Sequence, residues 1–164
     1  MIIVTGAAGF IGSCLIQKLN ELKFRYIIAV DDFSNEDKNR NLKGKSIMER
    51  IDRKDLFGWL EKNNREVEFF FHIGARTDTT EFDTNIFDEL KGQSKVIVVN
   101  TSVPRGWKDD NNQLIQRLAW NYPNIRLVDW ASISEGHPEY FAPDGVHLVP
   151  AGILVYVDAI MRYL

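Results

Sequence analysis

The sequence predicts an α/β fold: a doubly wound, three-layer α/β/α sandwich around a mostly parallel sheet of six strands. Short runs of β-branched residues alternate with segments of helical spacing along the 164 residues. Such alternation is typical of parallel sheets covered on both faces. Right-handed crossovers between the strands give a doubly wound sheet, for which we expect the order 3-2-1-4-5-6. The length favours a single domain that spans residues 1–164.

The expected elements follow from hydrophobic periodicity and from the residues that interrupt it. Strands are expected at residues 1–5, 26–30, 46–51, 67–73, 95–100 and 125–130, and helices at 10–22, 55–63, 82–90, 111–122 and 150–164. Ile11, Leu15, Leu19 and Leu22 share one face of the first helix. Asp55 can cap or charge the first turn of the second helix. The remaining segment 130–149 is a long loop, and such loops often carry function.

Composition excludes several classes of protein. The net charge of -3 argues against a large nucleic-acid surface, which usually needs a basic face. The single cysteine, Cys14, excludes an internal disulfide, and its place in a helical pattern predicts a small buried apolar residue. No apolar run approaches the roughly 20 residues of a membrane span. We therefore expect a cytoplasmic monomer that binds neither nucleic acid nor membrane.

The first expected strand leads into a glycine-rich turn, Gly6-x-x-Gly9-x-x-Gly12, that opens the first helix. Gly6 permits the tight turn, Gly9 lets the backbone approach a pyrophosphate, and Gly12 lets the helix pack against the strand. Phosphates bound here lie at the helix N-terminus, where free N–H groups and the helix dipole favour negative charge. The alternative interpretation is a glycine-rich turn that holds no ligand.

An acidic pair follows at the spacing that a dinucleotide site requires. Asp31 ends the second expected strand, about 20 residues after the turn, where a carboxylate binds an adenosine ribose hydroxyl. Asp32 is the neighbouring candidate. The strand, turn, helix and acidic residue in register favour a Rossmann/flavodoxin-like nucleotide site over an empty turn. Its expected contacts are Gly6, Ala8, Gly9, Phe10, Ile11, Gly12, Asp31 and Asp32.

Residues 1 to about 88 resemble the extended short-chain dehydrogenase/reductases, and among them the epimerases that act on ADP-glycero-manno-heptose. The matching segments are MIIVTGAAGFIGS, VDDFSN, MERIDRKDLF and FFHIGARTDTTEFDTNIFDEL. The resemblance implies that Ile51 and Asp52 lie near the adenine of NAD or NADP. It also implies that Gly74 and Ala75 lie near the pyrophosphate and the adjoining ribose.

The catalytic pair of that family is missing from the sequence. Its chemistry needs Tyr-x-x-x-Lys, in which the lysine lowers the pKa of the tyrosine so that it can act as acid or base. No tyrosine here has a lysine four residues later, and the nearest, Tyr122, is followed by Pro123 and Arg126. We also expect no substrate domain of that family within these 164 residues. We therefore expect no hydride transfer.

Residues from about 88 to 164 resemble the last half of an SGNH-type hydrolase, in particular the esterase domain of polysaccharide O-acetyltransferases. The match runs through KVIVVNTSVPRGW and ends with the motif Asp144-x-x-His147. The resemblance implies that His147 is a base oriented by Asp144. The nucleophilic serine of that family would stand in the turn that here reads Gly6-Ala7-Ala8, while Ser13 is better placed as a helix residue. Asn85 is at most a weak remnant of the oxyanion block.

The remaining polar and aromatic candidates have simpler interpretations. His72 lies in an apolar strand and is expected to be a satisfied core histidine, and three scattered histidines predict no metal site. The tryptophans are expected to pack rather than to stack on bases. The run 38–45 is expected to be a solvated loop, with a weak phosphate contact by Arg40 or Lys43 left open. The residues concerned are His72, His137, Trp107, Trp120 and Trp130.

The leading hypothesis combines these halves: an engineered or recombined chimera with no complete active site, possessing weak affinity for an adenine nucleotide. The chimera requires no cofactor. NAD, NADP or ADP is expected to bind weakly, provided that the cleft above the glycine turn is open. The alternative is an NAD(P)-binding protein of the epimerase/dehydratase type. The second alternative is a weak esterase, in which Asp144 and His147 face the turn after the first strand.

Overall fold

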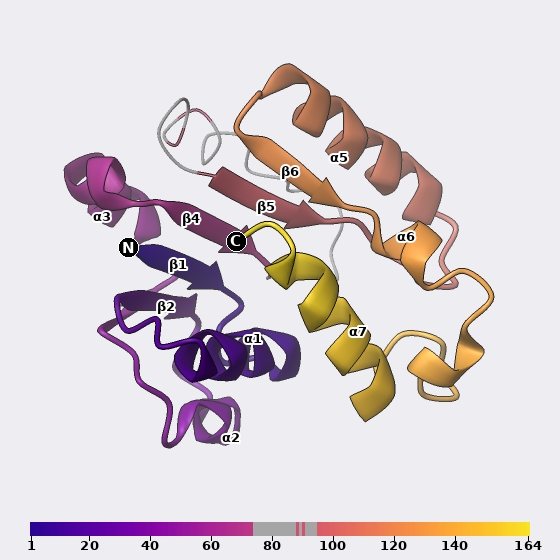
Figure 1. The fold of residues 1–164 in the computed structure, drawn as a ribbon, viewed down its shortest axis with the longest axis horizontal. Helices are drawn as coiled ribbons and strands as arrows, with labels where there is room; N and C mark the ends of the chain where they lie inside the picture. The colour runs from indigo at the N-terminus through magenta and orange to yellow at the C-terminus, as the bar shows by residue number, and fades with distance from the viewer. Residues whose placement is uncertain (74–87, 89, 91–94) are drawn as a thin grey trace. The chain divides into compact units, whose positions relative to one another are not determined.

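A computed structural model describes residues 1–73, 88, 90 and 95–164, and Figure 1 traces its α/β architecture. A six-stranded sheet has the order β3-β2-β1-β4-β5-β6. The pairs β1–β2, β1–β4 and β2–β3 are parallel. The predicted α/β class and the strand order 3-2-1-4-5-6 are therefore confirmed. The strands are β1 (Ile2–Thr5), β2 (Ile27–Asp31), β3 (Glu49–Asp52), β4 (Phe69–His72), β5 (Lys95–Val99) and β6 (Ile125–Val128).

The chain divides into two compact units, Met1–Val96 and Ile97–Leu164. The boundary lies within β5, eight residues beyond the junction expected near residue 88. A single domain over residues 1–164 stays a prediction.

The first unit is built on strands that are buried along their whole length. All residues of β1 and β2 are buried, because a parallel sheet covered on both faces leaves neither face of a strand in water. Helix α1 adds Leu15, Ile16 and Leu19, which are fully buried. The helical segments of this unit are α1 (Phe10–Glu21), α2 (Glu36–Asn39), η1 (Arg40–Leu42), α3 (Leu56–Asn63) and η2 (Asn64–Glu66).

Several expectations for this unit are corrected. Leu22 lies beyond the end of α1 and is 54% exposed, and Cys14 is only half-buried. Asp55 stands at the N-cap of α3, but its side chain makes no capping hydrogen bond. Residues 38–45 are not a plain loop: α2 and η1 fill most of this run, and Leu42 is buried. The helix expected at 82–90 lies outside the described residues except for positions 88 and 90.

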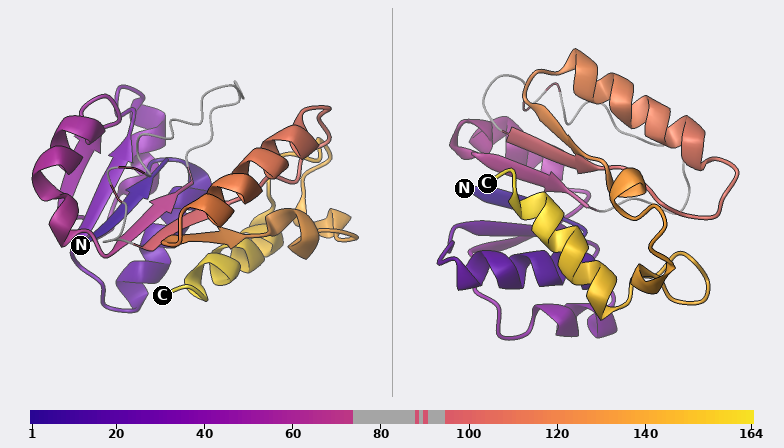
Figure 2. Two further views of the ribbon diagram at one scale, coloured as in Figure 1. Left: turned by 90° about the horizontal axis from the view of Figure 1, so that it is seen from above. Right: turned by 45° about the vertical axis from the view of Figure 1, so that its right-hand side comes forward.

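In the second unit, α5 lies beside β6 in the views of both Figure 1 and Figure 2. Helix α5 begins one turn earlier than the expected position 111. The strand expected to reach Trp130 ends at Val128, because Asp129 caps a short helix by accepting a hydrogen bond from Ser132 N. Trp130 is 3% exposed and packs edge-on against Tyr156. The helical segments are α5 (Lys108–Asn121), α6 (Trp130–Ile133), η3 (Pro138–Tyr140) and α7 (Pro150–Met161).

Candidate functional site

The glycine-rich turn between β1 and α1 depends on two of its three glycines for its backbone path. Gly6 has φ of 65°, in the left-handed region that favours glycine. A Cβ on Gly12 would lie 2.2 Å from the carbonyl oxygen of Gly6, and one on Gly9 would lie 3.1 Å from the same atom. Gly12 thus permits α1 to begin in contact with the turn, and the turn becomes a narrow cradle of bare backbone.

Ala8, in the middle of this turn, is fixed from both sides. Its main-chain N–H donates to Asp31 Oδ2 at 2.8 Å. Its carbonyl oxygen accepts from Asn41 Nδ2 at 2.9 Å. Asp31 is 9% exposed, and its other oxygen accepts from Asp32 N at 2.7 Å. The acidic residue at the end of β2 therefore determines the position of the glycine turn.

The first turn of α1 leaves donors available for an anion. Gly9 provides no side-chain cap, and the first turn contains no acidic residue. In the described part of the chain, the main-chain N–H groups of Phe10, Ile11 and Gly12 have no acceptor. Unsatisfied N–H groups at the start of a helix, together with the helix dipole, favour a phosphate.

The strand register brings the other candidates to the same edge of the sheet. Asp31 pairs with Asp52, and Val30 with Ile51, so the carboxyl ends of β2 and β3 are level. Ile51 is 6% exposed, and Asp52 Oδ1 accepts from Lys54 N at 3.0 Å. Gly74 and Ala75 lie outside the described residues.

Two cations that the sequence reasoning missed accompany the acidic pair. Arg53 Nη2 lies 3.2 Å from Asp32 Oδ2, and Lys38 Nζ lies 3.9 Å from Asp31 Oδ1. Both cationic side chains are about half exposed. Hydrogen bonds from Ser34 are the main reason that the pKa of Asp32 is lowered. For Arg53 the available signal was a basic residue two positions after the strand expected at 46–51, whereas Lys38 lies in the basic run 38–45. Arg40, the candidate from that run, pairs with the exposed Asp37.

His72, at the end of β4, has the environment expected for a satisfied core histidine. Its Nδ1 lies 3.2 Å from the hydroxyl of Thr5 on the neighbouring strand β1. Burial lowers the pKa of His72 to about 4, so the ring is neutral at neutral pH. A histidine held neutral between two strands is consistent with packing.

In the second unit, Asp144 and His147 form a hydrogen-bonded pair. Asp144 Oδ2 lies 2.5 Å from His147 Nδ1, and Asp144 Oδ1 accepts from the main-chain N–H groups of Val146 and His147. The hydrogen bond from the His147 ring is the largest of the causes that hold the pKa of Asp144 well below its usual range. His147 is largely exposed. Asp144 therefore orients the ring, as the resemblance implies.

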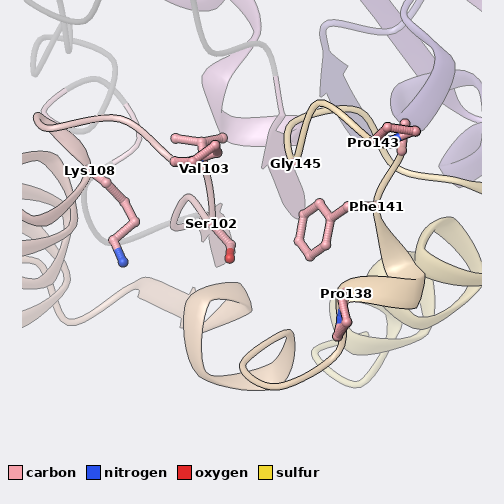
Figure 3. Close-up of a pocket in the computed structure, with 9 residues that line it drawn as sticks. Ser102, Val103, Lys108, Pro138, Phe141, Pro143 and Gly145 are labelled. Atoms are coloured by element: carbon pink, nitrogen blue, oxygen red, sulfur yellow. The ribbon is translucent and has the colours of Figure 1, made fainter.

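The tight loop that carries this pair also borders a cavity. Ala142 N donates to His147 O at 2.7 Å, and Gly145 adopts φ of 67° to complete the loop. A cavity of about 530 Å³ lies beside the loop. Figure 3 shows Ser102 and the Phe141 ring on its walls, with Lys108 farther along the same side as Ser102. Three prolines, Val103, Phe141 and Ala142 make up most of the lining, so this hollow is apolar with a polar margin.

The other candidates make local contacts. Ser13 Oγ donates to Phe10 O at 2.8 Å and is a helix residue as expected. His137 stacks on Tyr140 and contacts Glu139, while Asn85 lies outside the described residues. Among residues 1–73 and 95–164, no cluster of acidic, histidine or cysteine side chains has the arrangement of a metal site. None of the helices described there has the length and apolarity needed to cross a membrane.

Comparison with known proteins places the glycine turn in a family. Residues 2–116 match the model of the NAD dependent epimerase/dehydratase family. The chain belongs to this family. The match continues past the resemblance boundary expected near residue 88, through β5 and into α5. The family's NAD-binding fold therefore favours the alternative that the sequence left open over the chimeric scaffold as the leading interpretation.

Solved epimerase structures share the fold of this epimerase/dehydratase-family chain. UDP-glucuronic acid 4-epimerase from Bacillus cereus in complex with NAD is 22% identical, with a TM-score of 0.56 over 77% of this chain and 54% of that one. UDP-glucose 4-epimerase of Thermus thermophilus, also in complex with NAD, is 18% identical with a TM-score of 0.52 over 77% of this chain and 52% of that one. These similarities show a Rossmann-like fold.

A curated relative of a different kind also matches. The chain is 39% identical over 100 residues to the peptidoglycan O-acetyltransferase OatA of Listeria monocytogenes. The match covers 61% of this chain but only 16% of the length of that protein. The epimerase/dehydratase-family chain therefore shares sequence with a short part of a much longer acetyltransferase.

Proposed function

We propose that the first unit binds the adenine half of NAD or NADP, and that the chain performs no hydride transfer. The observation that carries the proposal is the hydrogen bond from Ala8 N to Asp31 Oδ2. It joins the residue type that holds an adenosine ribose to the turn that holds a pyrophosphate. The site residues thus form one hydrogen-bonded unit at the carboxyl edge of the sheet, where ligands of such folds bind.

The residues fit the dinucleotide chemically. The pyrophosphate would be held by the N–H groups of Phe10 and Ile11 at the start of α1, which Gly12 allows to begin in contact with the turn. A carboxylate has about four acceptor sites, so Asp31 has capacity for a ribose hydroxyl besides its two main-chain donors. Ile51 supplies an apolar wall for the adenine at the end of β3. When bound, the cofactor would supply a hydride acceptor or donor.

The exposed cations beside the acidic pair extend the proposal to NADP. A ribose 2′-phosphate needs a basic partner where NAD needs only the acidic residue. Arg53 and Lys38 lie within 4 Å of Asp32 and Asp31, respectively, and both can turn toward a phosphate. We therefore assign the 2′-phosphate to these two side chains.

The proposal includes no catalysis because neither half carries a complete set of reacting groups. The sequence contains no Tyr-x-x-x-Lys pair, and alanines stand where an SGNH-type hydrolase has its nucleophile. A dinucleotide-binding half joined to a hydrolase-like C-terminal half, by recombination or by engineering, accounts for both absences. Weak adenine-nucleotide affinity is the property that this arrangement retains.

A second candidate function is ester hydrolysis by Asp144 and His147. Their 2.5 Å contact next to an apolar cavity favours it. Hydrolysis of p-nitrophenyl acetate by the chain and by its His147→Ala variant tests it. We expect equal rates, no faster than free imidazole at the same concentration. A rate that is tenfold higher and is lost in His147→Ala would establish an esterase.

Titration calorimetry tests the main proposal. NADP, NAD and ADP are each titrated into the purified chain at millimolar concentration. We expect weak saturable binding of all three, with ADP about as tight as NAD, because the first unit supplies contacts only to the adenine half. The absence of binding heat with all three ligands, at a concentration where the chain is folded by circular dichroism, would reject the proposal.

A further inference from the structure

A second hollow, distinct from the dinucleotide site and from the cavity beside His147, lies between α5 and β6. Its volume is about 280 Å³. Six of its seven lining side chains end in an amide or a carboxylate, and Leu127 is the exception. The polar residues are Asn100, Asp109, Asn112, Gln113, Gln116 and Asp129. A hollow lined almost entirely by neutral amides and two carboxylates favours a ligand rich in hydroxyl groups.

The floor of this hollow is held in place by hydrogen bonds. Asn100 Nδ2 donates to Asp129 Oδ1 at 2.7 Å, and Asn100 Oδ1 accepts from Ala131 N at 2.9 Å. Asn112 exchanges two hydrogen bonds with the main chain of Thr101, at 2.9 and 2.8 Å. These floor residues therefore present their remaining polar atoms in fixed positions, at little further cost in side-chain entropy on binding.

The wall formed by α5 is different, because its polar groups are available. Gln113 and Gln116 are exposed, and in the described part of the chain neither side chain makes a hydrogen bond. Each amide offers two donors and an acceptor to a ligand. Asp109, also exposed, contacts its neighbour Lys108 at 3.3 Å.

An exposed tryptophan continues this wall. Trp120 is 88% exposed, which corrects the expectation that it is a packing residue. Asp109, Gln113, Gln116 and Trp120 are separated by four, three and four residues, so they lie along one face of α5. At a rise of about 1.5 Å per residue they span about 16 Å. These four side chains therefore share one face of α5, which we call the α5 strip.

We infer that the α5 strip, with Asn100 and Asp129 at its floor, binds a short neutral oligosaccharide. Sugar hydroxyls both donate and accept hydrogen bonds, and amides and carboxylates supply both kinds of partner. The C–H face of a pyranose ring packs against an exposed indole, which offers a large apolar face. Asp109 and Asp129 disfavour a nucleic-acid phosphate.

The test follows the indole N–H resonance of Trp120 by NMR while cellotriose, or triacetylchitotriose, is titrated into the full chain at millimolar concentration. Trp120→Phe identifies the resonance among those of the four tryptophans. We expect the Trp120 signal to shift saturably, while the signals of Trp59 and Trp130 stay unchanged. No shift with either sugar would overturn the inference.

Matched variants separate the strip from the rest of the helix. We expect Trp120→Ala to weaken binding at least tenfold, and the double variant Gln113→Ala/Gln116→Ala at least fivefold, measured through main-chain amide shifts of α5. Leu114→Ala is the control, because Leu114 is exposed on another face of the same helix. Equal affinity in all variants would overturn the inference. The same shifts with calcium chloride and no sugar would indicate a cation site and would also overturn it.

Discussion

The main-chain N–H of Ala8 donates to the buried carboxylate of Asp31 at 2.8 Å, joining the glycine-rich turn to the end of β2. Removing this acceptor leaves a buried N–H without a partner. We expect Asp31→Ala to lower the free energy of unfolding by about 1–3 kcal/mol and to abolish binding of ADP. Urea denaturation and calorimetry measure the two effects.

The matched control for that variant is Asp37→Ala. Asp37 is 83% exposed and pairs with Arg40 on the surface. Such pairs contribute about 0–1 kcal/mol, so stability should hardly change. If both variants lose stability equally, the bond between Ala8 and Asp31 does not hold the turn.

Alanine substitutions at two helical glycines are expected to change the stability of the chain in opposite directions. A Cβ on Gly12 would lie 2.2 Å from the oxygen of Gly6, whereas a Cβ on Gly58 in α3 meets nothing within 4 Å. We expect Gly12→Ala to destabilise the chain by about 1–3 kcal/mol or more through overpacking. Gly58→Ala should stabilise it by about 0.5–1 kcal/mol, because alanine favours helices. Thermal unfolding followed by circular dichroism measures both, and a neutral Gly12→Ala would contradict the tight start of α1.

The pair Arg53 and Asp32 predicts a preference between cofactors. If Arg53 turns to a ribose 2′-phosphate, Arg53→Ala should weaken NADP binding about tenfold and leave NAD unchanged, because a hydrogen bond to a charged group is worth about 1.5 kcal/mol. Lys62→Ala, an exposed cation near the end of α3, is the control. If Arg53→Ala weakens the binding of NAD and NADP equally, the Arg53 guanidinium does not contact the 2′-phosphate.

His72 predicts a dependence of stability on pH. Burial lowers its pKa to about 4 in the folded chain from 6.5 in the unfolded one. The unfolded state therefore takes up the proton first as the pH falls, so the stabilising contribution is complete above pH 6.5 and is lost toward pH 4. The slope is at most about 1.4 kcal/mol per pH unit. Urea denaturation at several pH values measures the free energy of unfolding of the parent and of His72→Gln. The difference in this free energy between the two should shrink as the pH falls from 6.5 to 4. Parallel curves of free energy against pH would contradict the prediction.

The sequence predicted the features that depend on local pattern. The alternation of apolar runs and helices determines the parallel sheet, and Gly6, Gly12 and Asp31 stand where the pattern of strand, turn and helix requires them. Asp144 and His147 are three residues apart, so their contact needs only one tight loop. Each of these relationships is set by neighbours in the chain or by strand register.

The features that the sequence did not predict depend on tertiary context. The apolar pattern of the sequence places Trp130 at the end of a strand. In the structure, Asp129 caps a short helix that begins at Trp130, and the Trp130 ring packs against Tyr156. Trp120 is a large aromatic residue of the kind that usually packs, but its side chain is 88% exposed near the C-terminal end of α5. The contacts of Arg53 with Asp32 and of Lys38 with Asp31 join different elements of the fold. The sequence alone does not place these residues side by side.

The most direct test of the dinucleotide proposal is an ADP titration followed by main-chain amide NMR of the full chain. The predicted result is saturable shifts of the Phe10, Ile11 and Gly12 amides, together with that of Asp32, because these groups would surround the pyrophosphate and ribose. Asp31→Ala should remove the shifts. Shifts confined to residues after 97, or none at millimolar ADP in the folded chain, would contradict the proposal that the first unit holds the nucleotide.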